Sequence, residues 1–231
     1  MKTSSGATTD MRFHYYHDES TMNRELAERI TALAHECIAQ KKQFSLVLSG
    51  GNTPRNLYTL LRDIKTDWSH WHIYFGDERC LPANTEGRND KMAFDAWLSH
   101  VAVPAAQIHS IPSELPQPEA VTQYTDTIKN TAQFDLVLLG IGEDGHTASL
   151  FPNNDWGTEK NAASVLAVSN APFAPAQRIT LSARRLSQTR HLWYLVSGAK
   201  KQNALLRWQQ GAHLPMTVIT PPNGVDVFVV Q

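Results

Sequence analysis

Short apolar segments alternate along the chain with longer segments of helical periodicity. Apolar residues recur at the 3.6-residue spacing of an amphipathic helix between residues 26 and 38. Ser20 or Thr21 is the predicted N-cap of that helix, because both side chains accept hydrogen bonds from backbone amides. The compact apolar run at residues 44–48 follows and predicts a strand. This order of elements is repeated along the chain.

The expected elements extend to the C-terminus. Strands are predicted at residues 12–17, 44–48, 71–75, 134–139, 165–168, 179–181, 192–196 and 225–230. Further helices are predicted from residue 53, at 92–98, around 121–128 and at 200–208. Alternating strands and helices favour an α/β fold with a largely parallel sheet and helices on both faces. Residues 1–10 are expected to form a flexible tail, and residues 11–231 a single α/β catalytic domain.

Three polar, glycine-rich segments directly follow predicted strands. They begin at Ser49, Gly76 and Gly140. In open parallel sheets, ligands bind outside the carboxyl ends of the strands. We therefore expect these three segments to share one edge of the sheet and to form a ligand site there.

The first segment is Ser49-Gly50-Gly51-Asn52-Thr53-Pro54. Paired glycines allow a ligand to approach the backbone closely, and the free amides of the following helix favour an anion. Thr53 and Pro54 are predicted as the cap and first residue of that helix. The segment lacks the Gly-Lys-Ser/Thr ending of a P-loop, so no nucleotide is implied. A tight turn with a helix cap remains the alternative to a phosphate site.

The other two segments contain acids, a base and a histidine. Asp77 and Arg79 follow the strand at 71–75 in a predicted loop, where they are either catalytic or a surface ion pair. His146 follows the strand at 134–139 among glycines, at the expected start of a helix. Histidine titrates near neutral pH and serves as a general base. Asp144 either orients this histidine or caps the helix.

Two cations complete the candidate site. Arg178 precedes the strand at 179–181, and Lys201 lies at a turn between a strand and a helix. Each is either a phosphate contact or an ordinary solvated charge. We predict no metal site, since the chain has no HExxH motif and the spacing of Asp144 and His146 indicates no third ligand.

Composition narrows the class of protein. The formal net charge of −1 gives no long-range field for nucleic acid or an acidic membrane, so neither is predicted as a partner. Two cysteines without a CxxC pair, and no apolar N-terminal segment of a signal peptide, predict a cytoplasmic location. No stretch approaches the roughly 20 apolar residues of a membrane span. The oligomeric state is left open.

Taken in order, these motifs resemble the glucosamine-6-phosphate isomerase/6-phosphogluconolactonase family. The resemblance covers roughly residues 13–205, and its most specific part runs from Leu139 to Pro152. It implies a modified doubly wound, Rossmann-like α/β sheet. It also implies hydrolysis of 6-phospho-D-glucono-1,5-lactone to 6-phosphogluconate, in the oxidative pentose phosphate pathway, without a cofactor. Asn52 departs from the serine common in the family, and Arg88 is left unassigned.

The resemblance also implies roles for individual residues. The family's catalytic histidine corresponds to His146, and its strand-end aspartate to Asp77. The phosphate loop corresponds to residues 49–53, and the cationic contacts to Arg79, Arg178 and Lys201. In the expected mechanism His146 activates water, and Asp77 or Asp144 steadies the imidazolium.

Three other functions are compatible with parts of the pattern. An amino-sugar-phosphate deaminase shares the loops, but it normally has an acid shortly after the histidine, where residues 147–152 contain no carboxylate. A non-catalytic sugar-phosphate sensor needs neither His146 nor Asp77. Metal-assisted hydrolysis by the same residues would be sensitive to a chelator.

Overall fold

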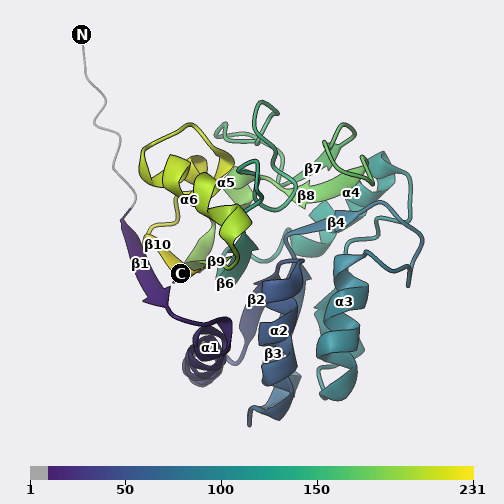
Figure 1. Cartoon of the computed structure of the whole chain (residues 1–231). Coiled ribbons are helices and arrows are strands. Elements are labelled where there is room, and N and C mark those ends of the chain that lie inside the picture. Colours follow the sequence, from purple (N-terminus) through teal and green to yellow (C-terminus); the bar gives the residue numbers. More distant parts are fainter. Residues whose placement is uncertain (1–9) are drawn as a thin grey trace.

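A parallel sheet forms the centre of the molecule (Figure 1). The computed structural model describes residues 10–231. Within them, the seven strands of this sheet lie in the order β1-β10-β9-β6-β2-β3-β5. Their bounds are β1 Met11–Tyr16, β2 Phe44–Leu48, β3 Trp71–Phe75, β5 Ile108–His109, β6 Phe134–Gly140, β9 Thr189–Val196 and β10 Val225–Val230. Every pair in the sheet is parallel, as the alternation of elements predicts. The predicted α/β class is confirmed.

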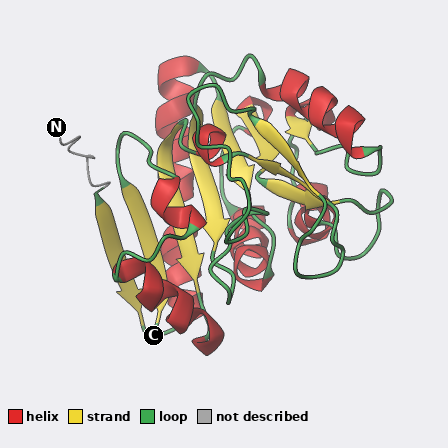
Figure 2. Ribbon diagram, turned by 90° about the horizontal axis from the view of Figure 1, so that it is seen from above, coloured by secondary structure: helices red, strands yellow, loops and turns green. Residues whose placement is uncertain are grey.

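Helices cover both faces of the sheet (Figure 2). They are α1 Glu19–Lys41, α2 Asn52–Leu60, α3 Asn89–Ala96, α4 Gln117–Ile128, α5 Ala183–Leu186 and α6 Gln202–Gln209. On one face Arg29 of α1 lies over the ring of Phe228. On the other face Tyr194 packs edge-on against Trp208 of α6, with ring centroids 4.9 Å apart. None of the helices described is long and apolar enough to cross a membrane.

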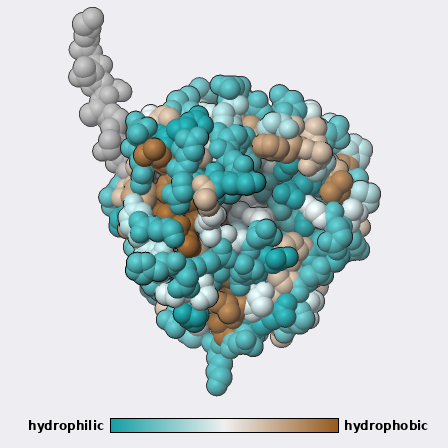
Figure 3. Space-filling view, in the orientation of Figure 1, coloured by the Kyte–Doolittle hydropathy of each residue, from teal (hydrophilic) through white to brown (hydrophobic). Residues whose placement is uncertain are grey.

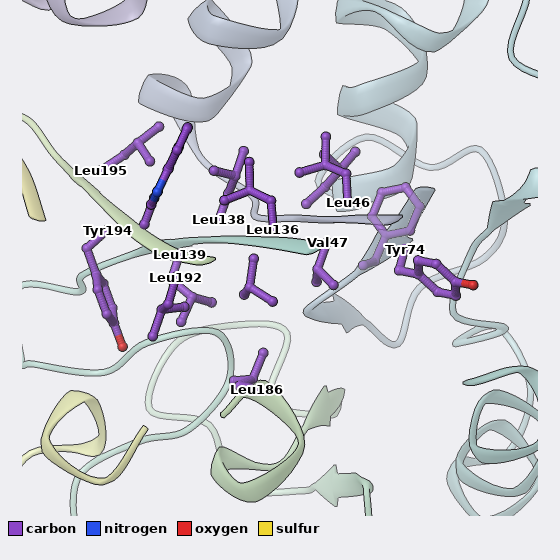
Figure 4. Packing of buried hydrophobic residues seen from close by; sticks show 14 of the residues in the cluster. Leu46, Val47, Tyr74, Leu136, Leu138, Leu139, Leu186, Leu192, Tyr194 and Leu195 are labelled. Atoms are coloured by element: carbon purple, nitrogen blue, oxygen red, sulfur yellow. The ribbon is translucent and has the colours of Figure 1, made fainter. Parts of the chain in front are cut away.

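The core is built by the strands that are buried on both faces. In β6 all residues from Phe134 to Leu139 are buried. Leu136 and Leu138 project to one side of the sheet, while Leu192 and Tyr194 of β9 project to the other (Figure 4). Such continuous apolar strands are expected in a sheet whose two faces are both covered. They hold the loops at the carboxyl ends in fixed positions.

A second, antiparallel sheet was not predicted. It consists of β4 Asp77–Arg79, β8 Arg178–Leu181 and β7 Val165–Val168, in the order β4-β8-β7. The prediction that residues 76–79 form a loop was therefore wrong for Asp77 to Arg79. Strand β4 is polar and only three residues long, so the sequence has no apolar pattern that indicates a strand there. Its pairing with β8 stabilises it instead.

Two helix starts also differ from their predictions. Asp18, not Ser20 or Thr21, caps α1, and its carboxylate accepts the amide of Thr21 at 2.8 Å. The second helix begins at Asn52 with Gly51 as its N-cap, two residues before the predicted start at Pro54 with Thr53 as cap. Gly51 has φ of +107°, a conformation that glycine adopts without steric cost.

The predicted tail at residues 1–10 lies outside the described residues except for Asp10. The carbonyl of Asp10 accepts the amide of Val225 at 2.8 Å, and its carboxylate accepts Nη1 of Arg12 at 2.8 Å. The start of the described chain is therefore bound to the edge of the sheet beside β10.

Acid should destabilise the fold through two stacked histidines at the opposite edge. Burial first, and then the charge of His72, lower the pKa of His109 to about 4, and burial lowers that of His72. In the unfolded chain a histidine binds its proton near pH 6.5. The stability contributed by these neutral histidines is therefore fully present above that pH and is lost as the pH falls toward 4. Because the His109 ring is partly exposed, we expect a loss of about 1 kcal/mol.

Urea unfolding at pH 7 and pH 5 measures this effect. His109→Gln should reduce the difference in unfolding free energy between the two pH values, whereas His100→Gln, an exposed control, should not. A His109→Gln protein with the full wild-type difference would contradict the assignment.

Candidate active site

A pocket of about 230 Å³ opens at the carboxyl ends of the central strands. Figure 3 shows this face with a hollow near its centre, rimmed mainly by hydrophilic residues. Predicted site residues lining the pocket are Ser49, Gly50, Gly51, Asp77, Arg79, His146, Arg178 and Lys201. The other lining residues are Asn89, Gly140, Ile141, Gly142 and Ala148. The three segments that follow strands thus meet in one pocket, as expected. Arg178 of β8 and Lys201, in the turn before α6, complete its lining.

The loop after β2 presents backbone amides to the pocket. The Tyr58 hydroxyl accepts the amide of Ser49 and donates to its carbonyl, both at 2.9 Å, which fixes the loop on α2. A side chain at Gly50 would collide with Asn89, since its Cβ would lie 2.0 Å from Oδ1. The structure described gives α2 no side-chain cap. The amides at its first turn are therefore available to an anion in the pocket.

Two arginines lie side by side in the pocket lining. Arg79 of β4 and Arg178 of β8 are directly paired in the antiparallel register. Among residues 10–231 neither forms a salt bridge, and Nε of Arg79 is buried without a hydrogen-bond partner. Burial, and then the charge of Arg79, lower the pKa of Arg178. Adjacent like charges are unfavourable unless an anion compensates them, so this wall is suited to a phosphate.

Loss of one guanidinium should weaken anion binding. Charge-assisted hydrogen bonds contribute about 1.5–3 kcal/mol, so we expect Arg178→Gln to weaken the binding of inorganic phosphate about 10- to 100-fold. Titration calorimetry measures this change directly. Arg184→Gln, which lies outside the pocket lining, serves as the matched control. Equal phosphate affinity in Arg178→Gln and wild type would exclude Arg178 from the anion site.

His146 and Asp144 form a bonded pair in the loop after β6. Oδ1 of Asp144 lies 2.5 Å from Nδ1 of His146 and accepts the backbone amide of the same histidine at 3.0 Å. An ionised carboxylate at Nδ1 favours the tautomer with its proton on Nδ1. Nε2 then has a free lone pair, and no described residue forms a hydrogen bond to it. His146 is thus arranged to accept a proton from a molecule in the pocket.

The tight geometry of this loop depends on Gly142. The amide of Gly142 donates to the carbonyl of His146 at 2.7 Å. A Cβ at Gly142 would lie 2.0 Å from Nδ1 of His146 and 2.7 Å from Oδ1 of Asp144. Contrary to prediction, no helix begins at His146 in the described chain, because Thr147 and Leu150 pair in a short antiparallel bridge. Asp144 therefore orients the histidine instead of capping a helix.

Asp77 is buried and bonded to two residues that sequence reasoning missed. Its Oδ2 accepts the hydroxyl of Ser149 at 2.5 Å, and its Oδ1 accepts Nδ2 of Asn89 at 3.2 Å. Asn89 lines the pocket at the start of α3. The Asn89 and Ser149 contacts are both long-range, so no local spacing indicated them. The hydrogen bonds place Asp77 in the pocket wall and leave the orientation of His146 to Asp144.

Glu78, next to Asp77, faces the interior. Its carboxylate accepts the backbone amides of Arg79, Asn89 and Asp90 at 2.7–2.8 Å, so it joins β4 to the start of α3. Burial, followed by the negative charge of Asp90, raises the pKa of Glu78 to about 7. Glu78 is therefore a structural support for the wall that carries Asp77 and Arg79.

Several other polar residues lie outside the pocket lining. Arg88 directs all its N–H groups to Asp90, Glu114 and two backbone carbonyls, so it is no phosphate contact. Lys200 is exposed, and its Nζ lies 3.8 Å from Oε1 of Glu143. Thr53 donates to Glu19 at 3.3 Å instead of lining the pocket. Asn52 and Asp144 are also absent from the lining. No described cluster of three histidine, cysteine or acidic side chains is suited to a metal ion.

Comparisons with known proteins agree on one family. Residues 17–228 match the family described as glucosamine-6-phosphate isomerases/6-phosphogluconolactonase. The chain is 31% identical over 214 residues to a 6-phosphogluconolactonase of Mycobacterium leprae, covering 85% of each chain. It is 37% identical over 185 residues to one from Synechocystis sp., covering 76% of this chain and 75% of the relative.

Solved structures support the same assignment. A 6-phosphogluconolactonase from Thermotoga maritima superposes with a TM-score of 0.89 at 26% identity, covering 96% of this chain and 100% of that chain. A 6-phosphogluconolactonase from Shewanella baltica superposes with a TM-score of 0.85 at 26% identity, covering 98% of this chain and 100% of that chain. The chain belongs to the glucosamine-6-phosphate isomerase/6-phosphogluconolactonase family.

Proposed function

We propose that this protein hydrolyses 6-phospho-D-glucono-1,5-lactone to 6-phosphogluconate, in the oxidative pentose phosphate pathway. The observation that carries the proposal is one pocket lined by two chemically different sets of groups. Arg79, Arg178 and the start of α2 favour a phosphate, and the Asp144–His146 pair provides a general base. The relatives named 6-phosphogluconolactonase support the choice of substrate.

The reaction needs one group that accepts and then returns a proton. Nε2 of His146 takes a proton from water as its oxygen attacks the lactone carbonyl carbon. Backbone N–H groups that face the pocket stabilise the oxyanion. Collapse of the tetrahedral intermediate breaks the bond from this carbon to the ring oxygen. His146 then donates its proton to the ring oxygen, and Asp144 stabilises the imidazolium in the interval.

The remaining lining residues have supporting roles in this scheme. Lys201 and the amides of residues 50–53 add to the phosphate end, and Ser49 supplies a hydroxyl donor. Asp77, held by Ser149 and Asn89, keeps a fixed carboxylate in the wall for a hydroxyl group of the sugar. No organic cofactor enters the scheme, and no metal is required by it.

The rival activities are separated by product. Lactone decay is followed by nuclear magnetic resonance, and ammonia release from glucosamine 6-phosphate is followed in a parallel reaction. We expect lactone decay far above the spontaneous rate and no ammonia. Ammonia release would favour the deaminase, and saturable binding without turnover would favour a sensor. Loss of lactone decay with a chelator, restored by zinc or manganese, would favour metal-assisted hydrolysis.

The same protein is proposed to act as one catalytic domain in the cytoplasm. Pairing of β1 with β10, at the two ends of residues 11–231, supports the single domain. Cys37 and Cys80 are free thiols in the described chain, which suits a reducing compartment.

A further inference from the structure

One large apolar side chain stands exposed beside the candidate base. Phe173 is 50% exposed, and its ring centroid lies 6.0 Å from that of His146. The ring centroid of Phe151 lies 4.7 Å from that of the same imidazole, but Phe151 is buried. Phe173 is not needed by the core, because the small buried cluster near this loop is made of Phe151, Val168 and Ala171. Phe173 does not line the pocket itself, so its exposed position beside the imidazole of His146 requires another explanation.

The backbone of Phe173 is tied to the phosphate end of the pocket. Nη2 of Arg178 donates to the carbonyl of Phe173 at 3.3 Å, and Nε donates to that of Pro175 at 3.1 Å. The amide of Ala171 donates to the carbonyl of Ala176 at 3.1 Å and closes this exposed loop. One arginine thus holds the loop and lines the pocket. The loop of residues 171–176, the Phe173 loop, thus contacts both Arg178 and His146.

A phosphorylated substrate held at Arg178 must pass this loop to reach His146. In the proposed reaction the phosphate is bound at Arg178, and the carbonyl under attack lies near Nε2 of His146. Between them is the sugar ring, whose C–H groups form an apolar face. An exposed aromatic ring beside the base gains stability when such a face covers it.

We propose that Phe173 is a specificity-determining residue that packs against the ring of the bound lactone. The inference rests on the proposed function and deepens it. Hydrolysis opens the ring, so the flexible product lacks a rigid apolar face to offer. Phe173 therefore favours the cyclic substrate over the open-chain product and assists product release. The phosphate contacts, in contrast, are the same for both molecules.

Kinetics of Phe173→Ala separate these two contributions. We expect KM for the lactone to rise about tenfold, because the apolar contact is lost, with kcat changed less than about threefold. The inhibition constant for 6-phosphogluconate and the affinity for inorganic phosphate should change less than about twofold. Phe173→Tyr, which keeps the ring, should restore the wild-type KM. Phe94→Ala is the matched control, because Phe94 is 37% exposed and, among the described residues, only Phe151 and Phe173 place a ring against that of His146.

Each outcome decides the inference. A raised KM with an unchanged product constant, restored by Phe173→Tyr, supports it. An unchanged KM, or equal weakening of lactone and product, overturns it while leaving the proposed function intact. A wild-type protein without lactone hydrolysis overturns both. Thermal unfolding of each variant identifies a general loss of structure, which is not expected from an exposed position.

Discussion

Replacement of His146 by alanine is expected to lower kcat for lactone hydrolysis about a thousandfold, the usual contribution of a well-placed general base. Asp144→Asn should lower kcat about a hundredfold, because an amide at Nδ1 no longer stabilises the imidazolium or fixes its tautomer. The double variant should be no slower than His146→Ala, since Asp144 acts through the histidine. Initial rates over a range of lactone concentrations measure all three variants.

The double variant is the sharper part of this prediction. If Asp144→Asn slows the His146→Ala protein by a further large factor, Asp144 acts on the substrate independently. Circular dichroism and thermal unfolding check that the variants are folded. Wild-type turnover in a folded His146→Ala protein would exclude this residue as the base.

Gly142→Ala is expected to lower kcat at least about a hundredfold without any change to a charged or nucleophilic group. The added methyl would lie 2.0 Å from Nδ1 and 2.2 Å from Cε1 of His146, so the imidazole must move. Displacement also breaks the hydrogen bond to Asp144. The phosphate end is separate from this clash, so the affinity for inorganic phosphate should remain close to wild type. Steady-state kinetics and phosphate titration together test the prediction.

Gly76→Ala provides the matched control. A Cβ at Gly76 meets its nearest neighbour at 3.5 Å, an ordinary contact, and Gly76 is outside the pocket lining. Its kcat should stay within about threefold of wild type. A Gly142→Ala protein with wild-type kcat would show that the imidazole position seen here is not the reactive one.

Most of the central sheet could be predicted because its strands are distinct in sequence. The apolar run in β6 is continuous, and a polar glycine-rich segment follows it. In contrast β5 consists of only Ile108 and His109, both half-buried, which leaves no periodic signal. The antiparallel strand β4 is polar, so only its partner β8 reveals it. Short pieces held by long-range pairing are therefore the part of the fold that local pattern does not specify.

The candidate site divides in a similar way. Loops at strand ends converge in any parallel sheet, so Ser49, Asp77 and His146 could be placed together from pattern and resemblance. Asn89 and Ser149 could not, because their contacts with Asp77 join residues 12 and 72 positions apart. Asp144 differs, because it is only two residues from His146 and its spacing suits both a cap and an orienting carboxylate. Its hydrogen bond to Nδ1 of His146 distinguishes the two roles.

The decay of 6-phosphogluconolactone in the presence of a chelator shows whether the protein hydrolyses the lactone through His146 without a metal ion. The lactone is generated in situ by glucose-6-phosphate dehydrogenase, and its decay is compared for wild type, His146→Ala and buffer alone. We expect fast decay with wild type, unaffected by the chelator, and a rate near the spontaneous one with His146→Ala. If folded wild-type protein does not accelerate the decay, the proposed lactone hydrolysis is wrong.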